Sequence, residues 1–555
     1  MWLRWLGNIH TNKIIHREFM DDIIDKSIII LYFLIILVAG WILGRRNKNA
    51  GAEEIITGGH NLSWWRATLN VIAVSFDSGS FITTVGWGFI WGMNAQWNAV
   101  TLWFTAPFGA LFILPIYWRS KISSIPELFE KRFSKSVRLI FSGVLNILIL
   151  INISVMTIIG SIILNKFFGW PQHITAFGIV IFVGLFVIRG GIKTSLSINV
   201  FQSIFLLIMF FIIAGISLYH VGGISGIIDA KMLSKAGTPM ESLMPPGGWH
   251  TYDNVWYPLP SLFLWAPWVD IFWLPCNAVM IQRLMTSKDE RNSQKAIIAI
   301  GGWNFLFCLV SYIIGVSIAI LFANIPDVKP ENALLSLLTN PAFFPVGLKG
   351  LVIAALIASL TMGLEGNITA GSSMLLKDFY PLLNKRTLTE KQEIRTNRII
   401  QLILLLLLMG CLNQLFENHR IVEVGQIVLG DVSGVLAALL VVGIFSKRAT
   451  NKAAIVSSII GFAIALLLHN FTNMNFPYFG SISFFSTIFL IIALSYFDKP
   501  APEEQLKNIT VYTIAGIKGP FVGFHFWPGL LKWMIGLALG WWTFSFLWEW
   551  YITLK

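Results

Sequence analysis

The chain has 555 residues, of which 55% are hydrophobic and 12% are charged, with a formal net charge of +12. A soluble protein carries roughly twice that share of charged residues. The composition therefore excludes an ordinary soluble globular protein.

Apolar runs of roughly 18 residues or more, the length that a helix needs to cross a bilayer, recur along the whole chain. We count about fourteen of them. In chain order they lie near 27–44, 66–90, 98–118, 138–162, 172–188, 199–219, 257–282, 299–322, 348–375, 399–413, 422–445, 454–469, 479–496 and 528–549. The sequence therefore predicts an all-α polytopic membrane protein with about fourteen transmembrane helices.

Residues 1–26, ahead of the first run, lack the apolar core and the small-residue cleavage site of a secretory signal. We interpret them as an extracytoplasmic segment. Cys276, Cys308 and Cys411 all fall inside predicted spans. We interpret them as packing residues rather than as disulfide partners or metal ligands.

Basic residues concentrate in alternate loops, and the loops between them are nearly bare of positive charge. The basic loops lie at 45–48, 119–138, 283–295, 377–398 and 447–452. Cytoplasmic loops of membrane proteins carry this excess. The pattern predicts a plasma (inner) membrane protein with both termini extracytoplasmic, and it explains the positive charge without a nucleic-acid partner.

Acidic residues occur inside predicted spans, whereas no Lys or Arg lies in the hydrophobic part of any span. The four acids are Asp77, Asp270, Glu365 and Asp431. A carboxylate within the bilayer is costly and normally faces a cavity, an ion or a substrate. With no basic partner in the spans, we expect the interior to attract cations. The alternative is that Glu365 and Asp431 lie at span ends in headgroup water.

Two of these acids lie where a span is interrupted. Asp77 is in "SFDSGS", and Asp270 is in "WAPWVDIFWLP" between Pro267 and Pro275. Glycine and proline favour a local break of a helix. The two spans are five apart, and each heads a set of five. Transporters built from inverted repeats place broken helices at matching positions, with the binding site between them at the midplane.

Enzyme chemistry finds no support in the sequence. The nine histidines form no metal-spaced cluster, and there is no P-loop and no Ser/His/Asp arrangement. The aromatic-rich span 528–549 is typical of an interfacial belt. Its alternative role is a helix that docks a membrane-protein partner.

Four stretches resemble the sodium:solute symporter family. "LSWWRATLNVIAVSFDSGSFITTVGWGFIWG" resembles the first core helix, with its WW pair, broken centre and G-x-G exit. "MIQRLMTSKDERNSQKA" resembles the segment after the sixth core helix, and "GGIKTSLSINVFQ" the fifth-helix segment. "GLKGLVIAALIASLTMGLEGNITAGSSMLLKDFY" resembles the eighth core helix. The resemblance covers essentially the whole chain.

This resemblance implies a LeuT-like fold of two inverted five-helix repeats whose first and sixth core helices are broken. The core would span 66–446, with repeats at 66–219 and 257–446, one helix outside it at 27–44 and three additional helices at 452–549. It also implies symport of a small polar solute, such as a sugar or an amine-bearing compound, by alternating access. The coupling ion would be sodium, with no other cofactor.

A solute site and a sodium site follow from the same resemblance. The solute positions, with Asp77 added from the break, are Ser75, Asp77, Ser80, Ala99, Asp270, Trp273 and Gln426. The sodium positions are the carbonyls of Ala73 and Phe76 together with Ser359, Met362 and Gly363.

Three positions depart from the family. Met362 and Gly363 stand where the family has a pair of hydroxyl residues, and Asn199 stands where it has an acid. A methionine sulfur is a poor ligand for a hard cation. We therefore expect a rebuilt cation site centred on Asp77, or a proton-binding Asp77 in its place. The residues expected to support such a site are Asn199, Thr361 and Glu365.

Three functions stay open at this point. The leading one is cation-coupled symport. The second is a proton-coupled or uncoupled carrier with a degenerate sodium site, and the third is a non-transporting membrane subunit built on the same fold.

Overall fold

The computed structural model describes residues 23–43, 51–234, 239–243, 268–323, 330–384, 388–416, 421–472, 476–514 and 528–554, apart from single positions within some of these ranges. Every regular element in them is helical, and the only β contacts there are two isolated bridges. The prediction of an all-α protein is confirmed for this part of the chain.

The helices follow one another with short connections. After a first helix at Ile23–Leu43 they are α2 (Ala52–Ile56), α3 (Trp64–Ser75), α4 (Ser78–Trp91), α5 (Trp97–Val100), α6 (Leu102–Phe108), α7 (Leu114–Arg119), α8 (Ile125–Arg132), α9 (Lys135–Phe168), α10 (Gln172–Val221), α11 (Gly223–Asp229), α13 (Ala278–Met285), α14 (Glu290–Leu321), α15 (Ala333–Thr339), α16 (Leu348–Met374), α17 (Tyr380–Leu383), α18 (Glu390–Phe416), α19 (Ile421–Phe445), α20 (Asn451–Phe471), α21 (Phe476–Ser495), α22 (Glu503–Leu506) and α23 (Pro528–Leu554).

Among the described residues, 8 helices are long and apolar enough to cross a membrane. Several predicted spans are absent from that set because they are not continuous helices. The span at 66–90 is divided into α3 and α4, and the span at 98–118 is divided by the π-helical turn η2 (Gly109–Ile113). Conversely, the predicted spans 172–188 and 199–219 form one helix, α10, since the polar residues between them stay helical.

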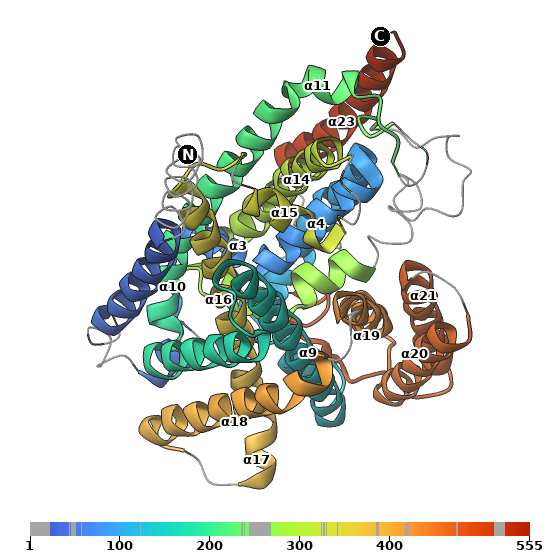
Figure 1. Ribbon diagram of the computed structural model, residues 1–555. Coiled ribbons are helices and arrows are strands. Elements are labelled where there is room, and N and C mark those ends of the chain that lie inside the picture. Colours follow the sequence, from blue (N-terminus) through green and yellow to red (C-terminus); the bar gives the residue numbers. More distant parts are fainter. Residues whose placement is uncertain are drawn as a thin grey trace, which may run out of the picture.

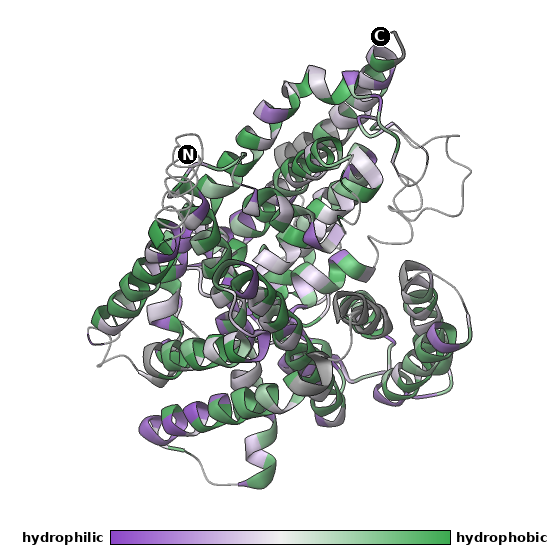
Figure 2. Ribbon diagram, viewed as in Figure 1, coloured by the Kyte–Doolittle hydropathy of each residue, from purple (hydrophilic) through white to green (hydrophobic). Residues whose placement is uncertain are grey.

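Helix α16 lies at the centre of the bundle (Figure 1). In its most apolar stretch 89% of the residues are buried, compared with 17% in the helix Ile23–Leu43. Hydrophobic residues cover most helices on all sides, and polar residues gather at ends such as the start of α18 (Figure 2). A helix that is apolar all round requires an apolar environment on its outer face, which a bilayer provides.

A buried arginine fastens α8 to the end of α19. Arg132 donates hydrogen bonds to the carbonyl oxygens of Gly443 (2.8 Å), Ser446 (2.8 Å) and Ala449 (3.0 Å). Cations are favoured at a helix C-terminus, where carbonyl groups lack helical partners. Burial lowers the pKa of Arg132 to about 10. The side chain therefore remains charged at neutral pH and holds this end of the bundle together.

Glycines bring α4 and α14 into backbone contact. A Cβ atom at Gly315 would lie 2.2 Å from the carbonyl oxygen of Val85 and 2.6 Å from the amide nitrogen of Phe89. A Cβ atom at Gly88 would lie 2.7 Å from the backbone of Tyr312. Small residues at such positions allow membrane helices to pack closely. The wall behind the break between α3 and α4 is consequently rigid.

We expect Gly315→Ala to lower the thermal stability of the purified protein, because backbone atoms of α4 cannot move out of the way of a methyl group. Overpacking of this kind costs about 1–3 kcal/mol. Gly302→Ala in the same helix is the matched control, since nothing lies within 4 Å of its added methyl group. Melting temperatures in detergent check this; equal values for the two variants would contradict the close contact.

Candidate functional site

The first core helix is interrupted at two residues. α3 ends at Ser75, α4 begins at Ser78, and Phe76 and Asp77 between them are not helical. Asp77 caps α4, because its Oδ1 accepts a hydrogen bond of 2.8 Å from the amide nitrogen of Ser80. The last carbonyls of α3 have no partner within their own helix. The break predicted at "SFDSGS" is confirmed.

The second break comes just before α13. The π-helical turn η5 (Phe272–Cys276) contains Pro275, and Asn277 after it is extended. Asn277 caps α13, with its Oδ1 accepting hydrogen bonds from the amide nitrogens of Val279 (2.9 Å) and Met280 (3.4 Å). The two breaks therefore use the same device, an Asp or Asn side chain at a helix N-terminus.

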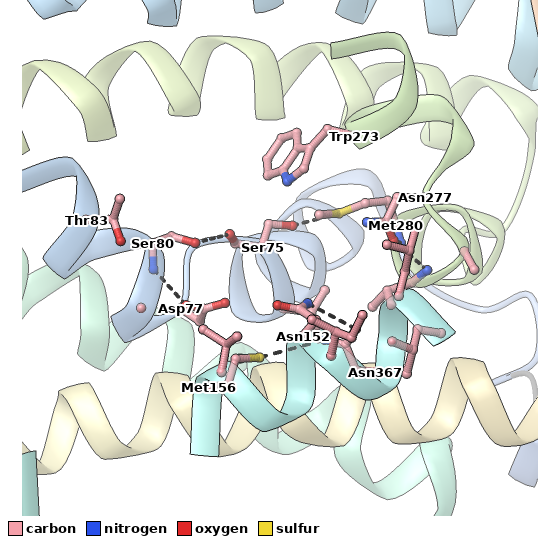
Figure 3. A pocket seen from close by; sticks show the side chains of 18 of the residues that line it. Ser75, Asp77, Ser80, Thr83, Asn152, Met156, Trp273, Asn277, Met280 and Asn367 are labelled. Carbon is pink, nitrogen blue, oxygen red and sulfur yellow. Dashed lines mark hydrogen bonds between the residues drawn. The ribbon is translucent and has the colours of Figure 1, made fainter. Parts of the chain in front are cut away.

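A cavity of about 310 Å³ lies between the two breaks and the helices α9 and α16 (Figure 3). Its polar lining residues are Ser75, Asp77, Ser80, Thr83, Thr84, Trp87, Asn152, Trp273, Asn277 and Asn367. Among the described lining residues Asp77 is the one charged side chain, and none is Lys, Arg or His. The electrostatic environment therefore disfavours an anion.

Hydrogen bonds between neighbouring helices order the cavity wall. Asn152 on α9 donates to the side-chain oxygen of Asn367 on α16 (3.3 Å), and Asn367 donates to the carbonyl oxygen of Gly363 (2.9 Å). Ser75 donates to the sulfur of Met280 across the breaks at 2.7 Å. Figure 3 shows these side chains grouped around the same space, with the Trp273 ring turned toward it.

Four of the predicted solute residues, Ser75, Asp77, Ser80 and Trp273, line this cavity. Asp270 does not line it. Its side chain is 4% exposed and accepts a hydrogen bond from Thr101. Residues 268–270 and η5 are π-helical. The wider turn of a π-helix rotates residues three apart, such as Asp270 and Trp273, away from a common face. The expected convergence of Asp270 with Asp77 is therefore corrected.

Two other predicted solute positions contribute nothing observable. Ala99 is buried on α5 and is not part of the cavity lining. Gln426 lies on α19, and its side chain falls outside the described residues, as does that of Asp431.

The predicted sodium positions face the end of α3. A Cβ atom at Gly363 would lie 3.3 Å from Cβ of Asp77 and 2.2 Å from the terminal carbon of Met156. The side chains of Asp77 and Met156 thus occupy the space that a hydroxyl residue at Gly363 would need. The Asp77 carboxylate and the missing hydroxyl share one location.

The other predicted cation residues have local partners. Ser359 donates its hydroxyl to the carbonyl of Leu356 (3.0 Å), and Thr361 donates to that of Ala358 (2.8 Å). Their lone pairs are still available. Met362 turns toward α10, where it lines a small void of about 10 Å³ with Asn199 and Thr361.

Glu365 has a basic partner, contrary to the expectation for the intramembrane acids. Its Oε2 lies 2.8 Å from Nη2 of Arg283, and both side chains are buried. Arg283 was assigned to a basic loop, but it lies on α13, within reach of α16. Hydropathy along the chain does not reveal this partner because the pair is 82 residues apart.

Sequence reasoning missed the amide residues of the site, which are Asn152, Asn277 and Asn367. A signal was present for Asn152 and Asn367, since each interrupts an otherwise apolar helix. Buried amides in membrane helices normally bond across helices.

A second cavity of about 640 Å³ meets the first at Ala278, which lines both. Charged residues line it from two of the basic loops or their margins: Lys121, Glu127, Lys377 and Glu393. Gln282 on α13 crosses between them with a 3.4 Å hydrogen bond to Ser373. α13 therefore separates the apolar-walled cavity from a charged vestibule.

We expect Asp77→Asn to leave the melting temperature close to that of the wild type, because Asn caps a helix as well as Asp does. Asp77→Ala should cost about 1 kcal/mol through loss of the cap. Thermal unfolding in detergent measures both. If Asn and Ala destabilise equally, the cap is not what holds the break.

Residues 55–461, which include both breaks and the cavity, match the sodium:solute symporter family. The chain is 23% identical over 537 residues to sodium/glucose cotransporter 1 of Ovis aries, a match that covers 87% of this chain and 80% of the relative. It is 24% identical over 518 residues to the sodium/glucose cotransporter of Vibrio parahaemolyticus, covering 88% and 93%. A solved Na+-coupled sialic acid symporter, in a substrate-bound outward-open state, superposes with a TM-score of 0.73 at 19% identity over 86% of this chain and 99% of that chain, which shows a shared LeuT-type fold. The chain therefore belongs to the sodium:solute symporter family and is a multi-pass membrane transport protein.

Proposed function

We propose that the protein is a sodium-coupled symporter that carries a small polar solute, uncharged or cationic, through the cavity at the two helix breaks. The observation that carries this proposal is the cavity's chemistry. One carboxylate and three amides line it, together with hydroxyl groups, and no basic side chain does so among the described lining residues. Relatives named for sodium and glucose, and a structural neighbour named for sodium and sialic acid, support the same class of activity.

The dimensions and lining favour a sugar, a polyol or an amine-bearing compound. A volume of about 310 Å³ is at the small end of ligand pockets, which span roughly 300–1,000 Å³. Amides and hydroxyls both donate and accept hydrogen bonds, as sugar hydroxyls require. Trp273 and Trp87 offer apolar faces for the carbon skeleton. A simple anion would lose its hydration without gaining a basic partner.

For the coupling ion we propose a site built from the carbonyls of Ala73 and Phe76, the hydroxyl of Ser359 and the carboxylate of Asp77. Hard cations prefer oxygen ligands. Asp77 replaces the hydroxyl that Gly363 lacks, since its Cβ lies 3.3 Å from where that side chain would begin. Met362 supplies no oxygen, and its side chain turns toward α10.

Alternating access follows from the position of α13. Solute in the first cavity reaches the charged vestibule only if α13 moves, because Ala278 borders both spaces. The hydrogen bond of Gln282 with Ser373 holds α13 against α16 in this state. Binding at the breaks changes the stability of α13 relative to α16, which is how occupancy would control opening.

We further propose the layout that the sequence predicts. Fourteen helices would cross the membrane, with a first helix at 27–44, repeats at 66–219 and 257–446, and three further helices at 452–549. Both termini would be extracytoplasmic, since the basic loops resist translocation. The vestibule would then open to the cytoplasm.

Uptake into proteoliposomes tests the function. Across a panel of radiolabelled sugars, polyols and amines, an inward sodium gradient should drive accumulation of at least one solute, and Asp77→Asn should abolish that accumulation while the protein remains folded. Asp289→Asn is the matched control, because Asp289 also caps a helix (2.8 Å to the amide nitrogen of Asn292) but lies outside the cavity. Sodium stimulation that survives in Asp77→Asn would refute the rebuilt site. Uptake driven only by a proton gradient would favour the proton-coupled alternative, and no uptake of any solute would favour a non-transporting subunit.

Cysteine labelling tests the layout. In a Cys411→Ser background, Ser136→Cys at the start of α9 should react with a membrane-impermeant maleimide only from the cytoplasmic side. His173→Cys, just beyond the other end of α9, should react only from outside. Both positions are exposed. The reverse labelling would invert the proposed orientation.

A further inference from the structure

A polar cluster lies where α10, α13 and α16 meet, away from the cavity. Arg283 is 0% exposed and Glu365 is 1% exposed, and their Nη2 and Oε2 atoms lie 2.8 Å apart. Asn199 of α10 donates from Nδ2 to the same Oε2 at 3.5 Å and to Oγ of Ser195 at 3.2 Å. The cluster contains one fixed positive charge and one negative charge.

Half of the hydrogen-bonding groups in this cluster have no protein partner. The buried atoms without one are Nε and Nη1 of Arg283, Oε1 of Glu365 and Oδ1 of Asn199. A buried ion pair offsets its desolvation only when its remaining groups are also bonded. An unpartnered buried polar atom is costly and indicates an additional partner. Packing alone therefore does not account for this cluster.

The cluster adjoins the cation site that we propose at the end of α3. Glu365 follows Met362 by three residues on α16, so the two side chains lie on neighbouring parts of one helix face. Met362 and Asn199 line the same small void. Arg283 is near the end of α13, one turn before the basic loop that begins after Met285. A cation leaving the α3 site toward that loop passes these residues.

We propose that Glu365 and Asn199 form a second station for the coupling cation, and that Arg283 is a resident cation that competes for Glu365. This inference rests on the proposed sodium coupling. Oε1 of Glu365 and Oδ1 of Asn199 are hard oxygen ligands of the kind that sodium prefers. The guanidinium keeps its charge in proteins, so it competes permanently. A sodium ion at this station is held only briefly, because Arg283 displaces it, and the station therefore passes the ion on instead of storing it.

Opposite effects of the two ion-pair partners test this idea. Binding of ²²Na⁺ to the purified full-length protein, measured by scintillation proximity, should tighten about tenfold in Arg283→Gln, within the usual range of coupling between two sites. In Arg283→Gln/Glu365→Gln, and in Arg283→Gln/Asn199→Ala, that gain should disappear. A purely structural ion pair predicts the contrary, namely that removing Arg283 weakens or does not change sodium binding.

A matched control removes a different cation from a different carboxylate. Lys193 on α10 pairs with Glu54 at 2.5 Å, and Lys193→Gln should leave the affinity for ²²Na⁺ unchanged. Folding has its own measurement. Arg283→Gln should melt at a higher temperature in sodium chloride than in choline chloride, by more than the wild type does, because sodium replaces the lost guanidinium. An Arg283→Gln protein that is unfolded in both salts would overturn the station.

The two proposals fail in different ways. If the wild type binds no ²²Na⁺ and sodium does not stimulate its uptake, sodium coupling itself is wrong and the station with it. If the wild type binds ²²Na⁺, Asp77→Asn does not, and Arg283→Gln binds like the wild type, the cation site at Asp77 stands and the second station is refuted.

Discussion

Inside a bilayer every backbone N–H and C=O group needs a partner within the protein, and this constraint governs where the chain can be irregular. Helix α3 stops at Ser75 in the middle of the bundle, so the amide groups that begin α4 would be left without acceptors. The Asp77 carboxylate fills that role with a 2.8 Å hydrogen bond to Ser80. One oxygen of this side chain maintains the break, and the carbonyls released at the end of α3 become available to an ion.

The break persists because its surroundings cannot close around it. Gly315 and Gly88 bring the backbones of α14 and α4 into direct contact, and a Cβ atom at Gly366 of α16 would lie 2.6 Å from Val74 of α3. With no side chains between them, these helices set the position of α3 and α4 to within a fraction of the size of a methyl group. The cavity is thereby defined by backbone packing, and polar side chains give it chemical character.

How far the sequence predicts this arrangement depends on how local each signal is. The interruption at Phe76 and Asp77 was predicted correctly because glycine, serine and aspartate in an apolar run carry their meaning within a few residues. The direction of Asp270 was not, since a π-helical turn alters which residues share a face and leaves no clear mark in composition. The partner of Glu365 was also missed, because Arg283 lies 82 residues away and its side chain looked like part of a basic loop. Tertiary pairing of this kind is invisible to hydropathy.

The two carboxylates near α16 illustrate how environment divides roles between identical groups. Asp77 faces a cavity with no fixed cation among its described lining residues, so its charge is available to a mobile ion or to a polar solute. Glu365 faces a guanidinium at 2.8 Å, so a mobile ion reaches it only in competition with Arg283. A strong site followed by a contested one gives an ion a reason to enter and a reason to leave. A carrier needs both, since binding that is only strong would hold the ion and stop the cycle.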